Sequence, residues 1–410
     1  MKPRLLFISH VDPSSPNSGQ QQRVFYSAKA ARVFFHTTLL TLGTGKSEGV
    51  SLLIDLFDDV IFLPPTRFNF FQKIYYALSY IIFHLKSGLK LSNYVLSELV
   101  FTKDNIETIT RDKYFDCVIL EYWHAYKSLS FFQDQGVPCI LDMHDVQWKS
   151  LEQQLKRKKY PTIYKRRITS LYKKNEELAW KSFDRIIAIN QIEQRIVKSI
   201  VSEGIVVDFL PMGIDINKWK YLWNKFDHSP FRIGFYGGLS SDANVKSALY
   251  CLEKILPLIW IKKPNVEFWL IGSNPAPILI KRSKADSRVK VTGFVENVQE
   301  IIAQIQVILC PWEGVFGFRS RVIEVMAVGT PLVVSRDAID GMGITDNAII
   351  IGKTNSEFAD LTLELLENNT LSQHISKNSR RLVEQCYSFD KTYLSYFNDL
   401  AKYIHRKSYE

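Results

Sequence analysis

The chain has 410 residues, which is more than one hydrophobic core usually holds, so we expect two domains. Hydrophobic residues make up 46% and charged residues 23% of the chain, which indicates a globular protein and excludes a disordered or fibrous one. The net charge of +10 is concentrated in the segment 156–174, which holds nine basic residues and no acid.

The first half of the chain alternates short apolar runs with longer segments of helical periodicity, the pattern of a doubly wound parallel sheet. The apolar runs predict strands at residues 5–9, 38–41, 60–63, 117–121, 139–142, 185–189 and 207–210. The opening MKPRLLFISHVDP is too briefly apolar for a signal peptide, and the stretch 68–85 is interrupted by Gln72, Lys73 and His84. We therefore expect no membrane span.

The second half repeats the same alternation. Its apolar runs predict strands at residues 233–236, 267–271, 289–292, 307–310, 332–334 and 348–351. Pro211-Met212-Gly213 ends the first series, and a polar, aromatic segment at 217–230 precedes the second, so we place the domain boundary between residues 212 and 230.

The cysteines argue against disulfides and zinc. Cys117, Cys139, Cys251, Cys310 and Cys386 are widely spaced, and no C-x-x-C pair is present. Three of them lie within strand-like apolar runs, where a small buried side chain is expected. This usage is typical of a reduced, cytosolic protein.

The segment 307–335, VILCPWEGVFGFRSRVIEVMAVGTPLVVS, is the most informative part of the chain. A buried strand leads into a loop with glycines and then a short helix, which we expect to stop at Gly329-Thr330-Pro331. Arg321 and Glu324, three residues apart, share one face of this helix near its N-terminus. Loop amides and an arginine suit a diphosphate, and a carboxylate suits ribose hydroxyls. A surface ion pair is the alternative.

Residues 317–333, GFRSRVIEVMAVGTPLV, resemble the donor-binding signature of retaining glycosyltransferases of the GT-B fold, family 4. The resemblance implies an α/β protein with two Rossmann-like, doubly wound domains that face each other across a cleft. Residues 1–212 would form an N-terminal acceptor-binding domain, and 213–391 a C-terminal nucleotide-sugar donor domain. A last helix within 392–410 would cross back to the first domain. Many family members carry an additional glutamate where this chain has Phe316.

The same resemblance assigns the donor site. The signature contributes Gly317, Phe318, Arg319, Arg321 and Glu324, and the strand-to-helix loop at 237–244 contributes Gly237, Gly238 and Asn244. Many relatives have two cations in that loop, which this chain lacks, so Arg321 would meet most of the diphosphate charge. Val295 follows a turn that offers backbone groups to the base. Gly19 resembles the glycine-rich loop of the first domain, with a plain helix cap at Ser18 as the alternative.

The resemblance also implies a histidine that approaches the transferred sugar from the first domain. His124, in CVILEYWH, is our candidate, and Arg321 is the second catalytic residue. His144, in LDMHDVQW, also follows a predicted strand and competes for the role. A packed structural histidine is the alternative for both, and neither has a recognisable metal-ligand spacing.

We therefore expect a retaining, hexosyltransferase-like enzyme that moves a sugar from a UDP-, GDP- or similar nucleotide-sugar to a hydroxyl. Its place would be in glycan, polysaccharide or glycolipid biosynthesis. The family's usual mechanism needs neither a protein nucleophile nor a metal, so we expect no cofactor. Two alternatives stay open: a non-catalytic nucleotide-sugar-binding or scaffolding subunit, and a nucleic-acid-binding protein that uses the basic segment.

The basic segment 156–174 and the apolar stretch 68–85 both lie in the expected acceptor domain. Together they would suit the inner, anionic face of a membrane and a lipid-linked acceptor. A solvated basic helix face and ordinary core are the alternative interpretations of these two segments.

Overall fold

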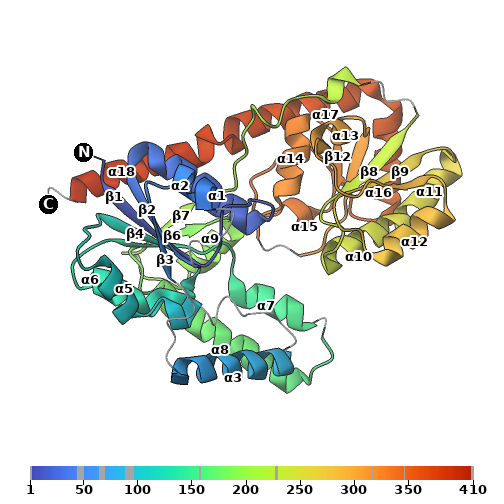
Figure 1. The fold of residues 1–410 in the computed structure, drawn as a ribbon. Helices are drawn as coiled ribbons and strands as arrows, with labels where there is room; N and C mark the ends of the chain where they lie inside the picture. The colour runs from blue at the N-terminus through green and yellow to red at the C-terminus, as the bar shows by residue number, and fades with distance from the viewer. Residues whose placement is uncertain are drawn as a thin grey trace. The chain divides into compact units, whose positions relative to one another are not determined.

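The computed structural model describes residues 2–407 except for 44–49, 64–69, 88–96, 157, 227–229, 315–316 and 346. The chain forms two compact units, here called unit 1 (Met1–Pro211 with Thr392–Glu410) and unit 2 (Met212–Lys391). Each unit contains one parallel sheet with helices around it (Figure 1).

The sheet of unit 1 has seven strands in the order β3-β2-β1-β4-β5-β6-β7, all parallel. The strands are β1 (Arg4–Ser9), β2 (His36–Leu42), β3 (Asp59–Leu63), β4 (Cys117–Glu121), β5 (Cys139–Asp142), β6 (Arg185–Ala188) and β7 (Val206–Phe209). Strand order reverses direction between β1 and β4, and such a point in an open sheet creates a crevice at the carboxyl ends of the strands.

The helices of unit 1 connect these strands. They are α1 (Gly19–Phe34), α2 (Val50–Leu56), α3 (Phe70–Ser87), α5 (Lys103–Thr110), η2 (Trp123–Leu129), α6 (Ser130–Gln133), α7 (Gln147–Lys156), α8 (Thr162–Trp180), α9 (Gln191–Lys198) and the C-terminal α18 (Ser395–Lys407). In Figure 1, α1, α2 and α18 gather on one face of the sheet, and α5 and α6 lie on the other.

The sheet of unit 2 has six parallel strands in the order β10-β9-β8-β11-β12-β13. The strands are β8 (Arg232–Tyr236), β9 (Glu267–Ile271), β10 (Val289–Val291), β11 (Val307–Cys310), β12 (Leu332–Val334) and β13 (Ile350–Ile351). Its helices are η3 (Trp223–Lys225), α10 (Asp242–Tyr250), η4 (Cys251–Ile255), α11 (Leu256–Lys262), α12 (Pro277–Ala285), α13 (Val298–Ala303), α14 (Ser320–Val328), α15 (Arg336–Ile339), α16 (Asn355–Glu367), α17 (Asn369–Leu382), η5 (Val383–Tyr387) and η6 (Asp390–Leu394), which runs across the boundary into unit 1.

The α/β fold class is confirmed, and every predicted strand overlaps an observed one. The predicted stop after the signature helix is also present, since Gly329 ends α14 with a φ of 92°. A Cβ at Gly329 would lie 2.2 Å from the Tyr221 ring, so this position requires glycine on two grounds. The predicted strand 117–121 coincides with β4, and Tyr122 then leaves the extended region with a φ of 64°, so His124 lies three residues beyond the strand.

The C-terminal helix α18 is part of the core of unit 1. The Phe397 ring is 1% exposed and lies 6.3 Å from the ring of Phe7 in β1 and 6.4 Å from that of Phe35. Tyr396 donates a hydrogen bond of 3.1 Å to Asp208 at the edge strand β7. The Phe397 ring therefore holds α18 to β1, and the Tyr396 hydroxyl holds it to β7.

The cysteines are all free, and four of them are buried, while Cys386 is exposed. Within the residues described, no helix combines the length and the apolar character that crossing a bilayer requires.

Replacing Phe397 with alanine is predicted to destabilise unit 1 by about 3–5 kcal/mol, because the cavity would lie between α18 and the sheet. Phe294→Ala is the matched control, since its ring is 81% exposed and should cost less than about 0.5 kcal/mol. Urea unfolding of both variants measures the difference. Equal, small losses would mean that α18 contributes little to the stability of unit 1.

Candidate functional site

Three strand ends of unit 2 meet through glycines. The Gly237 amide, just after β8, donates to the Ile271 carbonyl at the end of β9 (3.1 Å). Gly272 has a φ of 150°, and a Cβ there would lie 1.8 Å from the Gly237 carbonyl oxygen. Gly272 in turn pairs with Gly293, which follows β10. The backbones are therefore in direct contact at the carboxyl edge of the sheet, and Gly272 cannot carry a side chain.

The two glycines after β8 are not equivalent. We expected amides from both Gly237 and Gly238 at a phosphate, but the Gly237 amide is already bonded within the sheet. The Gly238 amide has no acceptor in the part of the chain that the structure describes. Asn244 donates from Nδ2 to the Gly238 carbonyl (3.0 Å) and so fixes this peptide. The expectation for the Gly237 amide was wrong. Of the two amides, that of Gly238 is the one that can donate to a phosphate.

Arg321, Glu324 and Tyr236 form one hydrogen-bonded group. Arg321 Nη1 donates to the Tyr236 hydroxyl (2.6 Å) and to Glu324 Oε2 (2.7 Å). Tyr236 also donates to Glu324 Oε2 (2.7 Å). The Glu324 side chain is only 2% exposed, so the carboxylate that we expected to bind ribose hydroxyls is buried. The ion pair that we considered as an alternative is present, but its acid is buried.

This group holds a cation in a fixed place. Burial tends to lower the pKa of Arg321, but the Glu324 carboxylate and Tyr236 outweigh it and raise that pKa further above its ordinary value. Burial and the same carboxylate raise the pKa of Tyr236, so its hydroxyl stays protonated. The Arg321 side chain is 34% exposed, and Nε and Nη2 have no acceptor among the described residues. Arg321 therefore keeps donors for an anion.

The loop before α14 is held by Arg319. Its Nη2 donates to the Gly314 carbonyl (2.6 Å), and its guanidinium lies 5.3 Å from the centre of the Trp312 ring. Burial lowers the pKa of Arg319. Gly317 has a φ of 75°, and the Phe318 ring lies 6.3 Å from that of Tyr387, against the core of unit 2. Arg319 thus shapes the loop, while the position of Phe316 lies outside the described residues.

The loop after β10 places Val295 at the surface. Gly293 turns the chain with a φ of 69°, Phe294 is 81% exposed, and Val295 is half-buried. This is the position that we predicted to offer backbone groups to a nucleotide base, and that role stays a prediction.

In unit 1, Ser18 caps α1. The Ser18 hydroxyl accepts from the Gln21 amide, and the Gln21 side chain accepts from the Ser18 amide (3.2 Å), so both halves of a capping box are present. A Cβ at Gly19 would meet nothing within 4 Å. The helix cap that we considered for this loop is therefore present, and donor or acceptor contact by Gly19 stays a prediction.

His124 lies in η2, two residues beyond the kink at Tyr122. Its Nε2 is 2.7 Å from the Tyr172 hydroxyl of α8, and its ring stacks on Trp123. The residue as a whole is partly exposed, but Nδ1 lies inside the protein. Burial, with a smaller effect of His10, lowers the pKa of His124 well below its ordinary value. The imidazole is therefore neutral.

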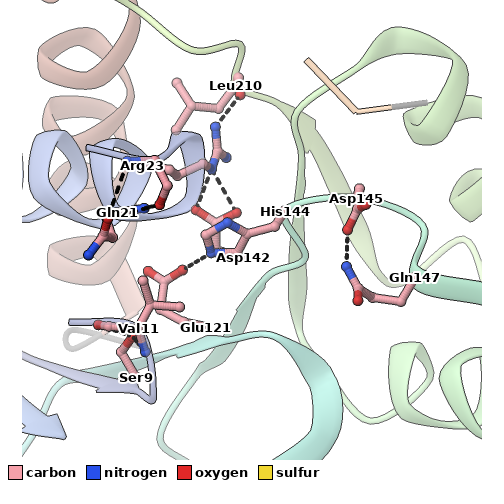
Figure 2. A network of polar contacts seen from close by, with 11 residues as sticks. Ser9, Val11, Gln21, Arg23, Glu121, Asp142, His144, Asp145, Gln147 and Leu210 are labelled. Atoms are coloured by element: carbon pink, nitrogen blue, oxygen red, sulfur yellow. Dashed lines mark hydrogen bonds and ion pairs between the residues drawn. The ribbon is translucent and has the colours of Figure 1, made fainter. Parts of the chain in front are cut away.

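His144 belongs to a buried network at the carboxyl ends of β4 and β5 (Figure 2). Its Nε2 lies 2.6 Å from Glu121 Oε2, and Arg23 of α1 donates from Nε to both oxygens of Asp142 (2.8 and 2.9 Å). Arg23 Nη1 donates to the Leu210 carbonyl (2.8 Å). Glu121, Asp142 and His144 lie within 4.8 Å of one another, as metal ligands can. The Arg23 guanidinium occupies both Asp142 oxygens, so the set does not suit a cation.

Two residues in this network have strained backbones. Tyr122 and His144 have φ values of 64° and 60°, and their rings stack with centroids 4.2 Å apart. Such conformations cost about 1–3 kcal/mol each and persist where the surroundings hold them, often at functional sites. Both lie next to the reversal of strand order between β1 and β4. Sequence reasoning found neither Tyr122 nor Arg23, Glu121, Tyr236 and Gly272, because nothing in their local pattern reveals a partner far along the chain.

Comparison with known proteins gives a family and several similar structures. Residues 230–368 match the family described as glycosyl transferases group 1. Sucrose-phosphate synthase from Thermosynechococcus elongatus is similar over 99% of this chain and 100% of its own, with a TM-score of 0.68 and 14% identity. HepE of Anabaena, solved with UDP and glucose, is similar over 98% of this chain and 99% of its own, with a TM-score of 0.64 and 14% identity.

A third structure, α,α-trehalose-phosphate synthase (UDP-forming) from Burkholderia vietnamiensis, covers 98% of this chain and 97% of its own, with a TM-score of 0.63 and 10% identity. No curated protein sequence matches the chain. The GT-B fold is confirmed over the whole chain, and the predicted resemblance to glycosyl transferases is confirmed in unit 2.

The neutral His124 predicts a pH dependence of stability. Its folded pKa lies well below its unfolded value of about 6.5, so its contribution is present above that pH and is lost as the unfolded chain takes up a proton below it. Between pH 7 and 5 the loss from this group is about 2 kcal/mol. Urea unfolding of the parent and of His124→Gln should show a smaller loss in the variant. His36→Gln, at an exposed position, is the control, and parallel curves for parent and His124→Gln would contradict the prediction.

Proposed function

We propose that the protein is a retaining glycosyltransferase of family 4 that moves a sugar from a nucleoside diphosphate to a hydroxyl group. The observation that carries the proposal is the Arg321 guanidinium, which Glu324 and Tyr236 hold by one nitrogen, while its other two nitrogens have no acceptor among the residues that the structure describes. The match of residues 230–368 to glycosyl transferases group 1 supports the reaction class. Retention rests on the resemblance of residues 317–333 to the family 4 signature.

In the proposed mechanism, unit 2 binds the donor and neutralises its leaving group. The bond between the sugar and the diphosphate breaks, and negative charge grows on the phosphate oxygens. Fixed donors that face this charge lower the barrier, because they need no reorganisation as it develops. We propose that Arg321 and the Gly238 amide donate to these oxygens, together with the loop at Gly317. The acceptor hydroxyl attacks from the face that the diphosphate leaves, and a phosphate oxygen takes its proton, so no protein nucleophile is needed.

We propose that the nucleotide of the donor is UDP. HepE was solved with UDP, and a trehalose-phosphate synthase of similar structure is named as UDP-forming. His124 and Gly19, in unit 1, are proposed to contact the transferred sugar or the acceptor. Because Nε2 meets the Tyr172 hydroxyl and Nδ1 is buried, His124 is proposed to contact the sugar without carrying a proton.

The test of the proposed function begins with ligand binding. Thermal unfolding with UDP, GDP and their sugars should show stabilisation by one nucleotide class, since a ligand of the folded state raises the midpoint. Release of the nucleoside diphosphate with an acceptor present then measures turnover. Stabilisation without turnover would favour the non-catalytic binding subunit, and no stabilisation by any nucleotide would contradict the donor site.

Arg321→Ala is predicted to lower kcat by about 100- to 1000-fold, with a smaller effect on donor affinity, because its contact strengthens as the bond breaks. Arg321→Lys should be more active than Arg321→Ala but less active than the parent, since lysine keeps the positive charge but lacks the planar guanidinium with its paired N–H donors. Arg282→Ala on α12 is the matched control, because this arginine pairs with Glu253 at the surface. An unchanged kcat in Arg321→Ala would remove Arg321 from the mechanism.

We further propose that unit 1 binds an anionic membrane surface, which would favour a lipid-linked acceptor. The helix α3 exposes large apolar side chains at helical spacing. They are Phe70 (72% exposed), Phe71 (80%), Ile74 (41%), Tyr75 (57%), Leu78 (52%) and Ile81 (48%). The basic helix α8 belongs to the same unit, and a helix with an exposed apolar face beside cationic surface is suited to a membrane interface.

Flotation with anionic vesicles should capture the protein at low salt and release much of it at high salt, because exposed charges are screened beyond about 10 Å at about 0.1 M. Phe70→Ser with Phe71→Ser should weaken capture at both salt concentrations. Ile261→Ser, at a position 80% exposed in unit 2, should leave it unchanged. No capture at low salt would mean that the basic segment is a solvated face.

A further inference from the structure

A pocket of about 370 Å³ is lined by residues of α7 and α8. These two helices of unit 1 pack against each other and are labelled in Figure 1. The lining residues of the pocket are Glu152, Leu155, Lys156, Thr162, Lys165, Arg166, Thr169, Ser170 and Lys173. They recur at intervals of three and four along each helix, so each helix contributes a single face. The volume is in the range of sites for small ligands.

The two helices are held in a fixed relation. Glu176 of α8 accepts from the backbone amides of Gln147 (2.9 Å) and Trp148 (2.7 Å), at the first turn of α7. At the other end, Leu151 and Leu155 of α7 are buried and contact Ile168 and Tyr172. The pocket therefore has a formed apolar floor and is not a chance gap between mobile side chains.

The polar part of the lining is cationic. Lys156, Lys165, Arg166 and Lys173 contribute four positive charges, and Glu152 is the single carboxylate. Lys156 pairs with Glu152 (3.3 Å) and Lys173 with Glu177 (3.6 Å), whereas Lys165 and Arg166 have no acidic partner in the described part of the chain. Burial lowers the pKa of the neighbouring Lys149, and the Lys173 and Lys156 ammonium groups lower it further, against Glu152 and Glu193. Lys165 and Arg166 are therefore the two cations of the lining that remain for an anion.

The remaining polar groups are the hydroxyls of Thr162, Thr169 and Ser170. Hydroxyl donors beside arginine and lysine suit the oxygens of a phosphate, because they donate several charge-assisted hydrogen bonds to one small group. Arg167 and Lys174 lie elsewhere on the surface of α8 and do not line the pocket.

We infer that this pocket is a binding site for a phosphate or diphosphate group, carried either by a soluble compound or by a lipid headgroup. The site lies wholly in unit 1 and does not use Arg321, so it is separate from the proposed donor site. Its helix α8 also carries Tyr172, whose hydroxyl meets His124 beyond β4. A phosphate bound here lies on the same helix that fixes the candidate histidine of the first unit.

The test uses inorganic pyrophosphate and the full-length protein, and protection of individual lysines of α8 separates this site from the proposed donor site. Pyrophosphate should protect Lys165 and Lys173 from acetylation, measured by mass spectrometry, while Lys174 stays reactive. Calorimetry should show a site that Lys165→Gln with Arg166→Gln weakens at least about tenfold, since two charge-assisted contacts are lost. Arg167→Gln with Lys174→Gln removes the same charge from the other side of α8 and should keep the affinity.

Binding to vesicles distinguishes a lipid headgroup from a soluble compound as the carrier of the phosphate group. Phosphatidic acid vesicles that protect the same lysines, and that pyrophosphate displaces, would identify a lipid headgroup as the ligand. Protection by pyrophosphate but not by these vesicles would identify a soluble phosphate compound. Equal loss of affinity in both variant pairs, or no protection of Lys165, would overturn the inference. Since UDP binding to the parent is measured separately, failure here leaves the proposed donor site untouched.

Discussion

The buried ion pair between Arg23 and Asp142 joins three parts of unit 1 that are far apart in the sequence. Arg23 comes from α1, Asp142 ends β5, and the Leu210 carbonyl that Arg23 also binds follows β7. The Arg23 side chain is fully buried, so loss of either partner would leave a charge without compensation, at a cost of about 3–5 kcal/mol. This ion pair fixes the strand ends around which Glu121, Tyr122 and His144 are arranged.

Unit 2 uses a similar arrangement for a different purpose. Glu324 is buried and accepts hydrogen bonds from Arg321 and Tyr236, but Arg321 reaches the surface. Arg23 has its charge enclosed by protein, whereas Arg321 is fixed by one nitrogen and presents the others. The same pairing of arginine with a buried carboxylate thus supports the fold in one unit and forms a candidate binding group in the other.

The sequence predicted the fold well, because buried parallel strands appear as short apolar runs, and each run from 5–9 to 348–351 overlaps a strand. It also predicted the segment of the candidate donor site, since Arg321 and Glu324 are neighbours on one helix. It did not predict that Glu324 is buried or that the Gly237 amide is occupied. Both depend on partners in other elements, Tyr236 and Ile271, and the spacing of residues along one segment does not reveal such contacts.

The division of the chain has a consequence for its synthesis. Unit 2 is one continuous stretch, whereas unit 1 is made of the first 211 residues and a segment that starts at Thr392. Domains usually fold as the ribosome releases them, from the N-terminus onward. Here unit 2 is synthesised before unit 1 is complete, because Phe397 and the rest of α18 follow unit 2 in the chain. Until α18 has been made, the apolar surface of Phe7 and Phe35 lacks the Phe397 ring that covers it in the folded unit.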